Sequence, residues 1–136
     1  MTPEQVQKRW NGYDDAQRNA WVAVSVMGWK VRGVQTRMGY LREYRKPDQQ
    51  RESDWIQGIP EFSTDHNHAH EALATFDYAI WKRWVRWDKD GQASCLLQRY
   101  ADCEHGPGYH PRQSSAPAAI SLACVMAVEC KENTDA

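Results

Sequence analysis

Apolar side chains at helical spacing open the chain. Val6 and Trp10 lie four residues apart, so one face of a helix would carry both. Thr2 precedes them with Gln5 three residues later, which is the pattern of a capping box, and Pro3 takes the first helical position, where no backbone N–H is needed. The sequence therefore predicts a helix that begins after Thr2.

A second capping pattern, Asp14 followed by Gln17, predicts another helix soon after the first. Gly28 marks its expected end, because glycine readily adopts the left-handed conformation that often follows a helix. The predicted apolar stripe of this helix consists of Ala16, Ala20, Ala23, Val24 and Met27.

Between Trp29 and Tyr44 the apolar residues fall two or four positions apart, with charged residues between them. This alternation is typical of an extended segment in a sheet that has one solvated face. The stretch 45–60 is polar and contains two prolines, which favours a surface loop.

The run Ser63, Thr64 and Asp65 predicts the start of a third helix, because each side chain can accept a hydrogen bond from a free N–H of the first turn. Apolar residues follow at helical spacing at Ala69, Leu73, Phe76 and Ile80. A helix N-terminus can also bind an anion, but Asp65 would repel one, so capping is the favoured interpretation. His66 and His70 share a face of this helix without a visible third metal ligand, and we expect both to be solvated.

The clearest β-hairpin signal lies near residues 84–100. Apolar and polar residues alternate on both sides of a turn at 88–91, whose Asp-Gly pair supplies the positive φ that tight turns require. The alternating apolar positions are Val85, Trp87, Ala93, Cys95 and Leu97. Segment 102–115 contains glycine, proline and histidine without periodicity and is predicted to be a loop.

A last helix is predicted over 118–130, led in by Ser115 or Ala116 and Pro117. It is apolar on nearly every side, which is typical of a helix at the centre of a domain. Residues 131–136 form a polar tail that we expect to be disordered. The whole pattern predicts a single domain, 1–136, of the α/β (α+β) class, in which about four helices pack on a short, mainly antiparallel sheet as a small layered sandwich.

Composition and charge narrow the class of protein. The chain has 136 residues, of which 41% are hydrophobic, so it can bury a core without disulfides or a metal. No apolar run has the length of a membrane span and no secretory signal is visible, so we expect a soluble cytoplasmic protein without a membrane partner. The formal net charge of −1 argues against binding nucleic acid by bulk charge, although residues 29–51 hold seven basic residues against two acidic ones.

The four cysteines are expected to be reduced, because nothing indicates export. One alternative is a zinc site, because two sulfur and two nitrogen ligands are available from Cys95, Cys103, His105 and His110. Cys103 beside His105 is another alternative, a thiol nucleophile, but no strand-turn-helix context accompanies it. The spacing matches no familiar metal motif, so the sequence predicts no metal, no cofactor and no catalytic residue.

Three segments in this order resemble a known family: Val-Met-Gly-Trp-Lys at 26–30, Ile-Pro-Glu-Phe-Ser-Thr-Asp at 59–65 and Ala-Pro-Ala-Ala-Ile at 116–120. Together they are similar to the phage ABA sandwich domain, a family of small proteins encoded by phages and prophages, over residues 20–128. The resemblance implies a layered α/β fold and a phage origin, and it supplies no catalytic residues. The family's usual tyrosine before Ser-Thr-Asp is Phe62 here.

Aromatic and basic residues are interleaved in two stretches, and such residues dominate the energetics of protein interfaces. The candidate partner-binding residues are Arg37, Tyr40, Arg42, Tyr44, Arg45, Lys46, Arg83, Trp84, Arg86 and Trp87. Most of the seven tryptophans are nevertheless expected to face the core.

Together with the resemblance, these stretches favour a phage- or prophage-encoded, non-enzymatic protein that binds a host protein in the bacterial cytoplasm, with counter-defence as its role. A nucleic-acid-binding regulator is the alternative, because the same residue types stack bases and neutralise phosphates. A zinc- or thiol-dependent site at Cys95, Cys103, His105 and His110 is a second and weaker alternative function.

Overall fold

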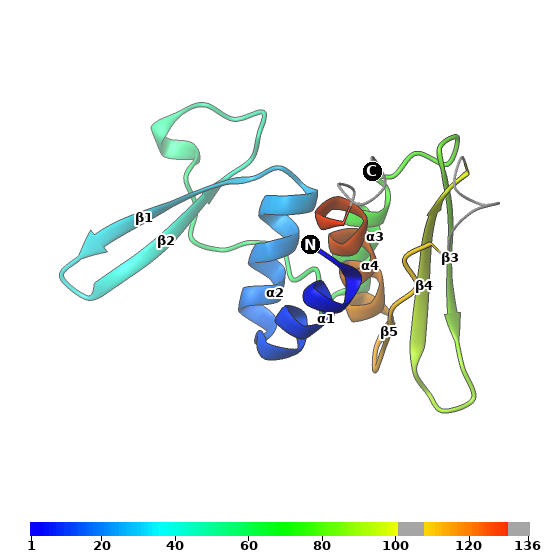
Figure 1. The fold of residues 1–136 in the computed structure, drawn as a ribbon. Coiled ribbons are helices and arrows are strands. Elements are labelled where there is room, and N and C mark those ends of the chain that lie inside the picture. The colour runs from blue at the N-terminus through cyan, green and yellow to red at the C-terminus, as the bar shows by residue number, and fades with distance from the viewer. Residues whose placement is uncertain (101–107, 131–136) are drawn as a thin grey trace.

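The computed structural model describes residues 1–100 and 108–130 (Figure 1). These residues form four α-helices and two antiparallel sheets, which confirms the predicted α+β class. The helices are α1 (Pro3–Gly12), α2 (Asp15–Trp21), α3 (His66–Leu73) and α4 (Ala116–Glu129). Within the described residues, no helix is long and apolar enough to cross a membrane.

Helix α4 is the centre of the fold, as its apolar sequence predicts. Ser115 is its N-cap and accepts the N–H of Ala118 at 3.3 Å. Almost every residue from Ala116 to Ala127 is buried, because α1, α3 and the larger sheet all pack against this helix. Tryptophans contribute as expected: four of the seven lie in or against the core, namely Trp10, Trp21, Trp29 and Trp81.

The larger sheet has the strand order β3-β4-β5 and contains the predicted hairpin. Strand β3 (Trp81–Trp87) pairs with β4 (Ala93–Arg99) across a turn in which Gly91 has a φ of 77°. Ala93, Cys95 and Leu97 are fully buried on the face that packs on α4.

The loop predicted at 102–115 is wrong for its second half. Strand β5 (Arg112–Gln113) pairs with β4, and Tyr109 forms a further bridge with Leu97. The paired stretch is short and contains Pro111, which weakens the strand signal in the sequence. Residues 101–107 lie outside the described part of the chain.

The first extended segment forms a sheet of its own rather than a part of one layered sheet. Strands β1 (Lys30–Thr36) and β2 (Gly39–Arg45) make a hairpin that projects away from the helices (Figure 1). Tyr44 is the one residue of either strand that is buried in the core. Because no other position of the two strands is buried, the hairpin has little apolar surface with which to pack against the larger sheet.

The predicted apolar stripe of the second helix is right at Ala20, Ala23 and Met27, which lie in or against the core, and wrong at the other two positions. The chain continues from α2 into a π-helical turn (Val22–Val26), in which the N–H of Met27 bonds to the carbonyl of Val22. The extra residue in this turn changes which side chains face inward. The buried residues are Asn19, Val22 and Ala23, whereas Ala16 and Val24 are exposed. Gly28, with a φ of 74°, ends the helix where the sequence predicts.

Helix α3 is shorter than predicted, and only one of its three predicted capping residues is the N-cap. It ends at Leu73, where Arg83 Nη1 donates to the Leu73 carbonyl at 2.5 Å, and Ile80 lies exposed in the turns that follow. Asp65 is the N-cap and accepts the N–H groups of Asn67 and His68.

The other predicted caps divide into two groups. Thr2 and Asp14 both form complete capping boxes, as predicted. Ser63 is not the cap of α3, because it is buried and donates both its N–H and its hydroxyl to Asn19 Oδ1, at 2.8 and 2.7 Å. Thr64 is exposed in the turn before Asp65.

Candidate binding surfaces

The two stretches that contain the predicted partner-binding residues lie on opposite sides of the helices, and most of these residues belong to one of two surfaces (Figure 1). One surface is the projecting β1–β2 hairpin, residues 30–45, which we call the arm. The other is the face of the β3-β4-β5 sheet that points away from α4, which we call the outer sheet face. The interleaved aromatic and basic stretches of the sequence therefore do not form one continuous surface.

The base of the arm is held by a cluster around Trp55, a residue that the sequence did not single out. The guanidinium carbons of Arg32 and Arg45 lie 4.3 and 4.5 Å from the Trp55 ring centroid. Arg32 also forms ion pairs with Glu43 at 3.0 Å and Glu52 at 2.6 Å. Its hydrogen bond lowers the pKa of the Glu52 carboxyl. The cluster joins both strands to the loop that follows them.

Two predicted partner-binding residues have structural roles at this base. Tyr44 is buried in the core, and its backbone N–H and carbonyl pair with Ile56 at 2.6 and 2.8 Å, so this residue fixes the base of the arm to the loop that follows. The ammonium of Lys46 lies 5.8 Å from the centroid of the buried Trp29 ring.

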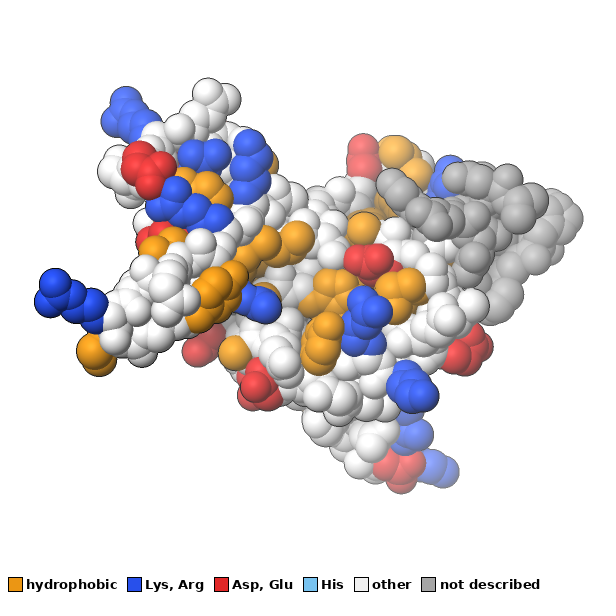
Figure 2. All heavy atoms as spheres, turned by 60° about the vertical axis from the view of Figure 1, so that its left-hand side comes forward, with side chains coloured by type: hydrophobic (Ala, Val, Ile, Leu, Met, Phe, Trp, Pro, Cys, Tyr) orange, Lys and Arg blue, Asp and Glu red, His pale blue; other side chains and the backbone are white. Residues whose placement is uncertain are grey.

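The outer half of the arm has no comparable contacts. Met38 is 95% exposed at the turn and Tyr40 is 65% exposed on β2. Arg37 and Arg42 are exposed, and neither forms an ion pair with any described residue. Figure 2 shows basic and hydrophobic side chains together at the end of the arm that points away from the helices. The outer half of the arm thus displays aromatic, apolar and cationic groups to solvent.

A groove of about 280 Å³ continues this surface toward the helices. Arg42 and Val31 line it from the arm, while Tyr13, Trp21 and Val24 line it from the helices. Figure 2 shows hydrophobic side chains along this side of the molecule. The amphipathic surface of the arm therefore extends onto the helical body.

The outer sheet face centres on Trp84. The His110 ring lies edge-on to the Trp84 ring with centroids 4.7 Å apart, and the Arg86 guanidinium lies 4.2 Å from its centroid. Arg112 lies on the same face, and its guanidinium binds Asp88 at 2.5 Å and Asp90 at 3.0 Å. The sequence named His110 only as a metal candidate and did not single out Arg112, because the segment 102–115 that holds both was predicted to be a loop.

Arg83 and Trp87 do not belong to the outer sheet face, because residues alternate across a strand. Arg83 caps α3 from the inner face and lies 3.4 Å from the Tyr78 ring centroid. Trp87 is 62% exposed at the end of β3.

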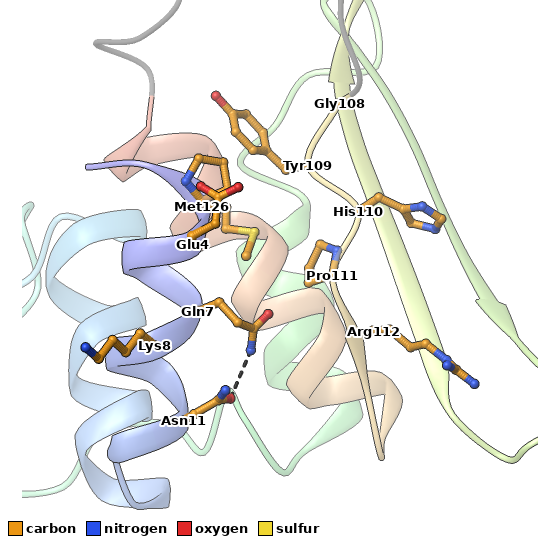
Figure 3. Close-up of a pocket in the computed structure, with 11 residues that line it drawn as sticks. Glu4, Gln7, Lys8, Asn11, Gly108, Tyr109, His110, Pro111, Arg112 and Met126 are labelled. Atoms are coloured by element: carbon orange, nitrogen blue, oxygen red, sulfur yellow. Dashed lines mark hydrogen bonds between the residues drawn. The ribbon is translucent and has the colours of Figure 1, made fainter.

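The proposed zinc set does not assemble from the residues that are described. Cys95 points toward α4, and burial raises the pKa of its thiol to about 12. His110 is on the opposite face of the sheet, which Figure 3 shows by its direction away from Pro111 and the helices. These two side chains cannot bind one metal ion. Cys103 and His105 lie outside the described residues.

The histidines of α3 form no metal centre either. The rings of His66 and His70 lie edge-on with centroids 4.3 Å apart, and burial lowers the pKa of the His70 imidazole. Among residues 1–100 and 108–130, no group of three or more metal-binding side chains comes together.

Comparisons with protein family models, with curated proteins and with solved structures found no match for this chain. The structure does show what the segment 59–65 does locally. Phe62 is fully buried and its carbonyl accepts the hydroxyl of the buried Ser121 of α4 at 2.7 Å, while Ser63 bonds to Asn19 of α2. This segment therefore joins α2 to α4.

The ion pair between Arg112 and Asp88 predicts a pH-dependent stability. The hydrogen bond from Arg112 lowers the pKa of Asp88, so the pair stabilises the fold above the ordinary carboxyl pKa of about 3.9 and loses this effect as the pH falls through the lowered value. We expect Asp88→Asn to have a lower Tm than the wild type at pH 7, and we expect this difference to shrink as the pH falls through the lowered pKa of Asp88. Thermal unfolding monitored by circular dichroism between pH 2 and 7 measures this difference.

The matched control is Lys89→Gln in the same turn, since Lys89 forms no ion pair with any described residue. Its Tm difference from the wild type should not change across this pH range. A Tm difference for Asp88→Asn that is as large at pH 2 as at pH 7 would contradict the assignment.

Proposed function

We propose that this protein is a non-enzymatic binding module that recognises a host protein through the outer half of its arm. The observation that carries the proposal is the exposure of Met38, Tyr40, Arg37 and Arg42 on a hairpin that projects from the body. Aromatic residues, methionine and arginine are enriched at the cores of protein interfaces. None of these four side chains takes part in the core of the fold.

The construction of the arm supports the same proposal. An isolated two-stranded hairpin is marginally stable in water. Here the cluster of Arg32, Arg45 and Trp55 holds the base in one geometry, so less conformational entropy is lost when the outer half binds a partner. A recognition element is expected to have a base fixed by contacts within the protein and an end whose side chains are exposed to a partner.

The resemblance to the phage ABA sandwich domain supplies the biological setting of the proposal. We propose that the protein is encoded by a phage or prophage and acts in the bacterial cytoplasm, where it inhibits a host defence factor by binding it.

The arm predicts a specific loss of binding. We expect the triple variant Arg37→Ala, Met38→Ser, Tyr40→Ser to recover at least tenfold less of the host partner than the wild type in a pull-down from bacterial lysate. The reason is that truncating a single hot-spot residue of an interface costs about 2 kcal/mol or more, whereas about 1.4 kcal/mol is already a factor of ten in affinity. Quantitative mass spectrometry of the nuclease-treated eluate measures the recovery.

The control variant is Lys82→Ala with Trp87→Ser, which removes one exposed cation and one exposed aromatic side chain from the opposite side of the molecule. It should retain the partner, and both variants should keep the wild-type Tm. Equal recovery of the partner by the wild type and the arm variant would rule out the arm as the recognition element.

A second candidate function is binding of single-stranded nucleic acid on the outer sheet face. Proteins bind single strands by stacking bases on aromatic rings and by pairing cations with phosphates. Trp84 supplies such a ring here, and Arg86 beside it supplies the cation. Fluorescence anisotropy of a labelled oligothymidine at low salt tests this function. Binding that weakens with salt and is lost in Arg86→Glu would support it, and an unchanged anisotropy would exclude it.

A further inference from the structure

A groove of about 800 Å³ lies between α1 and the segment 108–112 (Figure 3). Glu4, Gln7, Lys8 and Asn11 form its α1 wall, and Met126 of α4 lies between the two walls. Trp10 Nε1 donates to Gln113 Oε1 at 3.2 Å, which links the walls at the end where Asn11 and Arg112 lie. The volume falls within the range of roughly 300–1,000 Å³ that is typical of ligand sites.

The other wall of the groove is the free edge of a sheet. Tyr109 exchanges two backbone hydrogen bonds with Leu97, and the Pro111 carbonyl accepts the N–H of Cys95. Backbone groups alternate in direction along a strand, so the N–H and carbonyl of His110 point away from β4 and toward α1. Neither group of His110 bonds to a described backbone or side-chain group. The edge therefore presents an unpaired donor and acceptor to the groove.

We propose that this groove binds an extended peptide segment of a partner protein, which adds a fourth strand beside β5. The backbone of the segment pairs with the N–H and carbonyl of His110, as in other proteins that bind peptides by strand addition. This site is separate from the arm, so it would be a second interaction surface of the proposed binding module.

The charges of the α1 wall indicate the kind of segment that fits. Glu4 and Lys8 are four residues apart on α1, which is about 6 Å along the helix at 1.5 Å per residue. Alternate residues of a strand lie about 6.6 Å apart and point to the same side. A segment with a basic and an acidic residue two positions apart can therefore face both charges. The aliphatic parts of these side chains would cross the apolar floor at Met126 and Pro111.

The test uses peptides selected against the full chain from a displayed library of random hexapeptides. The affinity of each selected peptide is then measured by fluorescence anisotropy for the wild type, His110→Pro and His110→Ala. Proline removes the N–H that points into the groove and is tolerated at a strand edge, so the pairing with β4 remains. Both variants lose the contact with Trp84, which makes His110→Ala the matched control.

We expect binding to be at least tenfold weaker for His110→Pro and within twofold of the wild type for His110→Ala. We also expect bound peptide to slow hydrogen exchange of the His110 amide in the wild type, a readout that stands even if His110→Pro is unstable. The charge-swapped variant Glu4→Lys with Lys8→Glu should select peptides of reversed charge order. The arm variant should bind the peptides as tightly as the wild type does. The proposal for the groove can therefore be refuted or supported separately from the proposal for the arm.

Three results would overturn the proposal. They are a selection that enriches no peptide, selected peptides that bind His110→Pro as tightly as the wild type, and peptides that leave exchange of the His110 amide unchanged.

Discussion

Replacing Trp10 with alanine is expected to lower the free energy of unfolding by about 3–5 kcal/mol, the usual cost of truncating a large buried aromatic side chain. Trp10 is fully buried, and its ring centroid lies 6.5 Å from that of Trp21. The Arg18 guanidinium lies 5.1 Å from the ring, and the indole N–H binds Gln113. One side chain thus joins α1, α2 and β5, so its removal leaves a cavity where these elements meet.

Urea denaturation followed by circular dichroism measures this loss. Trp87→Ala is the matched control, because Trp87 is 62% exposed and its replacement should change stability by less than about 0.5 kcal/mol. If the two variants unfolded at the same urea concentration, the central position of Trp10 in the core would be wrong.

Replacing Asn19 with alanine is expected to cost about 2–3 kcal/mol. The Asn19 side-chain oxygen accepts both the N–H and the hydroxyl of Ser63, and both residues are buried. Without this oxygen the backbone N–H of Ser63 stays buried and unpaired, which costs about 1–3 kcal/mol, and the hydroxyl loses its acceptor as well. The same denaturation experiment measures the effect.

Two further variants make this prediction specific. Ser63→Ala removes only the hydroxyl and should cost about 1 kcal/mol in the wild type, but less when Asn19 is already alanine, because the two groups share one interaction. Asn11→Ala removes an exposed amide that bonds to Gln7 and should be nearly neutral. Additive effects of the Asn19 and Ser63 replacements would contradict the shared hydrogen bonds.

The elements that sequence patterns predicted correctly are those whose signals are local. The capping boxes at Thr2 and Asp14 and the Asp-Gly turn of the β3–β4 hairpin each depend on residues within a few positions of one another. Helix α4 was predictable because its burial follows from composition alone.

What the sequence did not reveal depends on contacts between distant segments. Strand β5 exists because residues 109–113 meet β4, and its own residues give a weak strand signal. Asn19 is polar in sequence but buried because Ser63 pairs with it from 44 positions away. The Trp55 cluster likewise brings Arg32, Arg45 and Glu52 together from three elements.

The candidate surfaces show the same limit. The sequence named Arg37, Tyr40, Arg42, Trp84 and Arg86 as candidates, and the structure places the first three on the arm and the last two on the outer sheet face. The sequence could not show that Tyr44 anchors the arm, that Arg83 caps α3, or that the two aromatic and basic stretches lie on opposite sides of the helices. Which residues share a surface is decided by how the strands pair and pack.

The central claim, that the arm recognises a host protein, is tested most directly by site-specific photo-crosslinking in bacterial cells. A photoreactive amino acid replaces Met38 at the end of the arm in one variant and Trp87 on the opposite side in another, both of which are exposed positions. The proposal predicts that position 38 crosslinks to one host protein in high yield and that position 87 does not. Absence of a crosslink from position 38, or the same products from both positions, would contradict it.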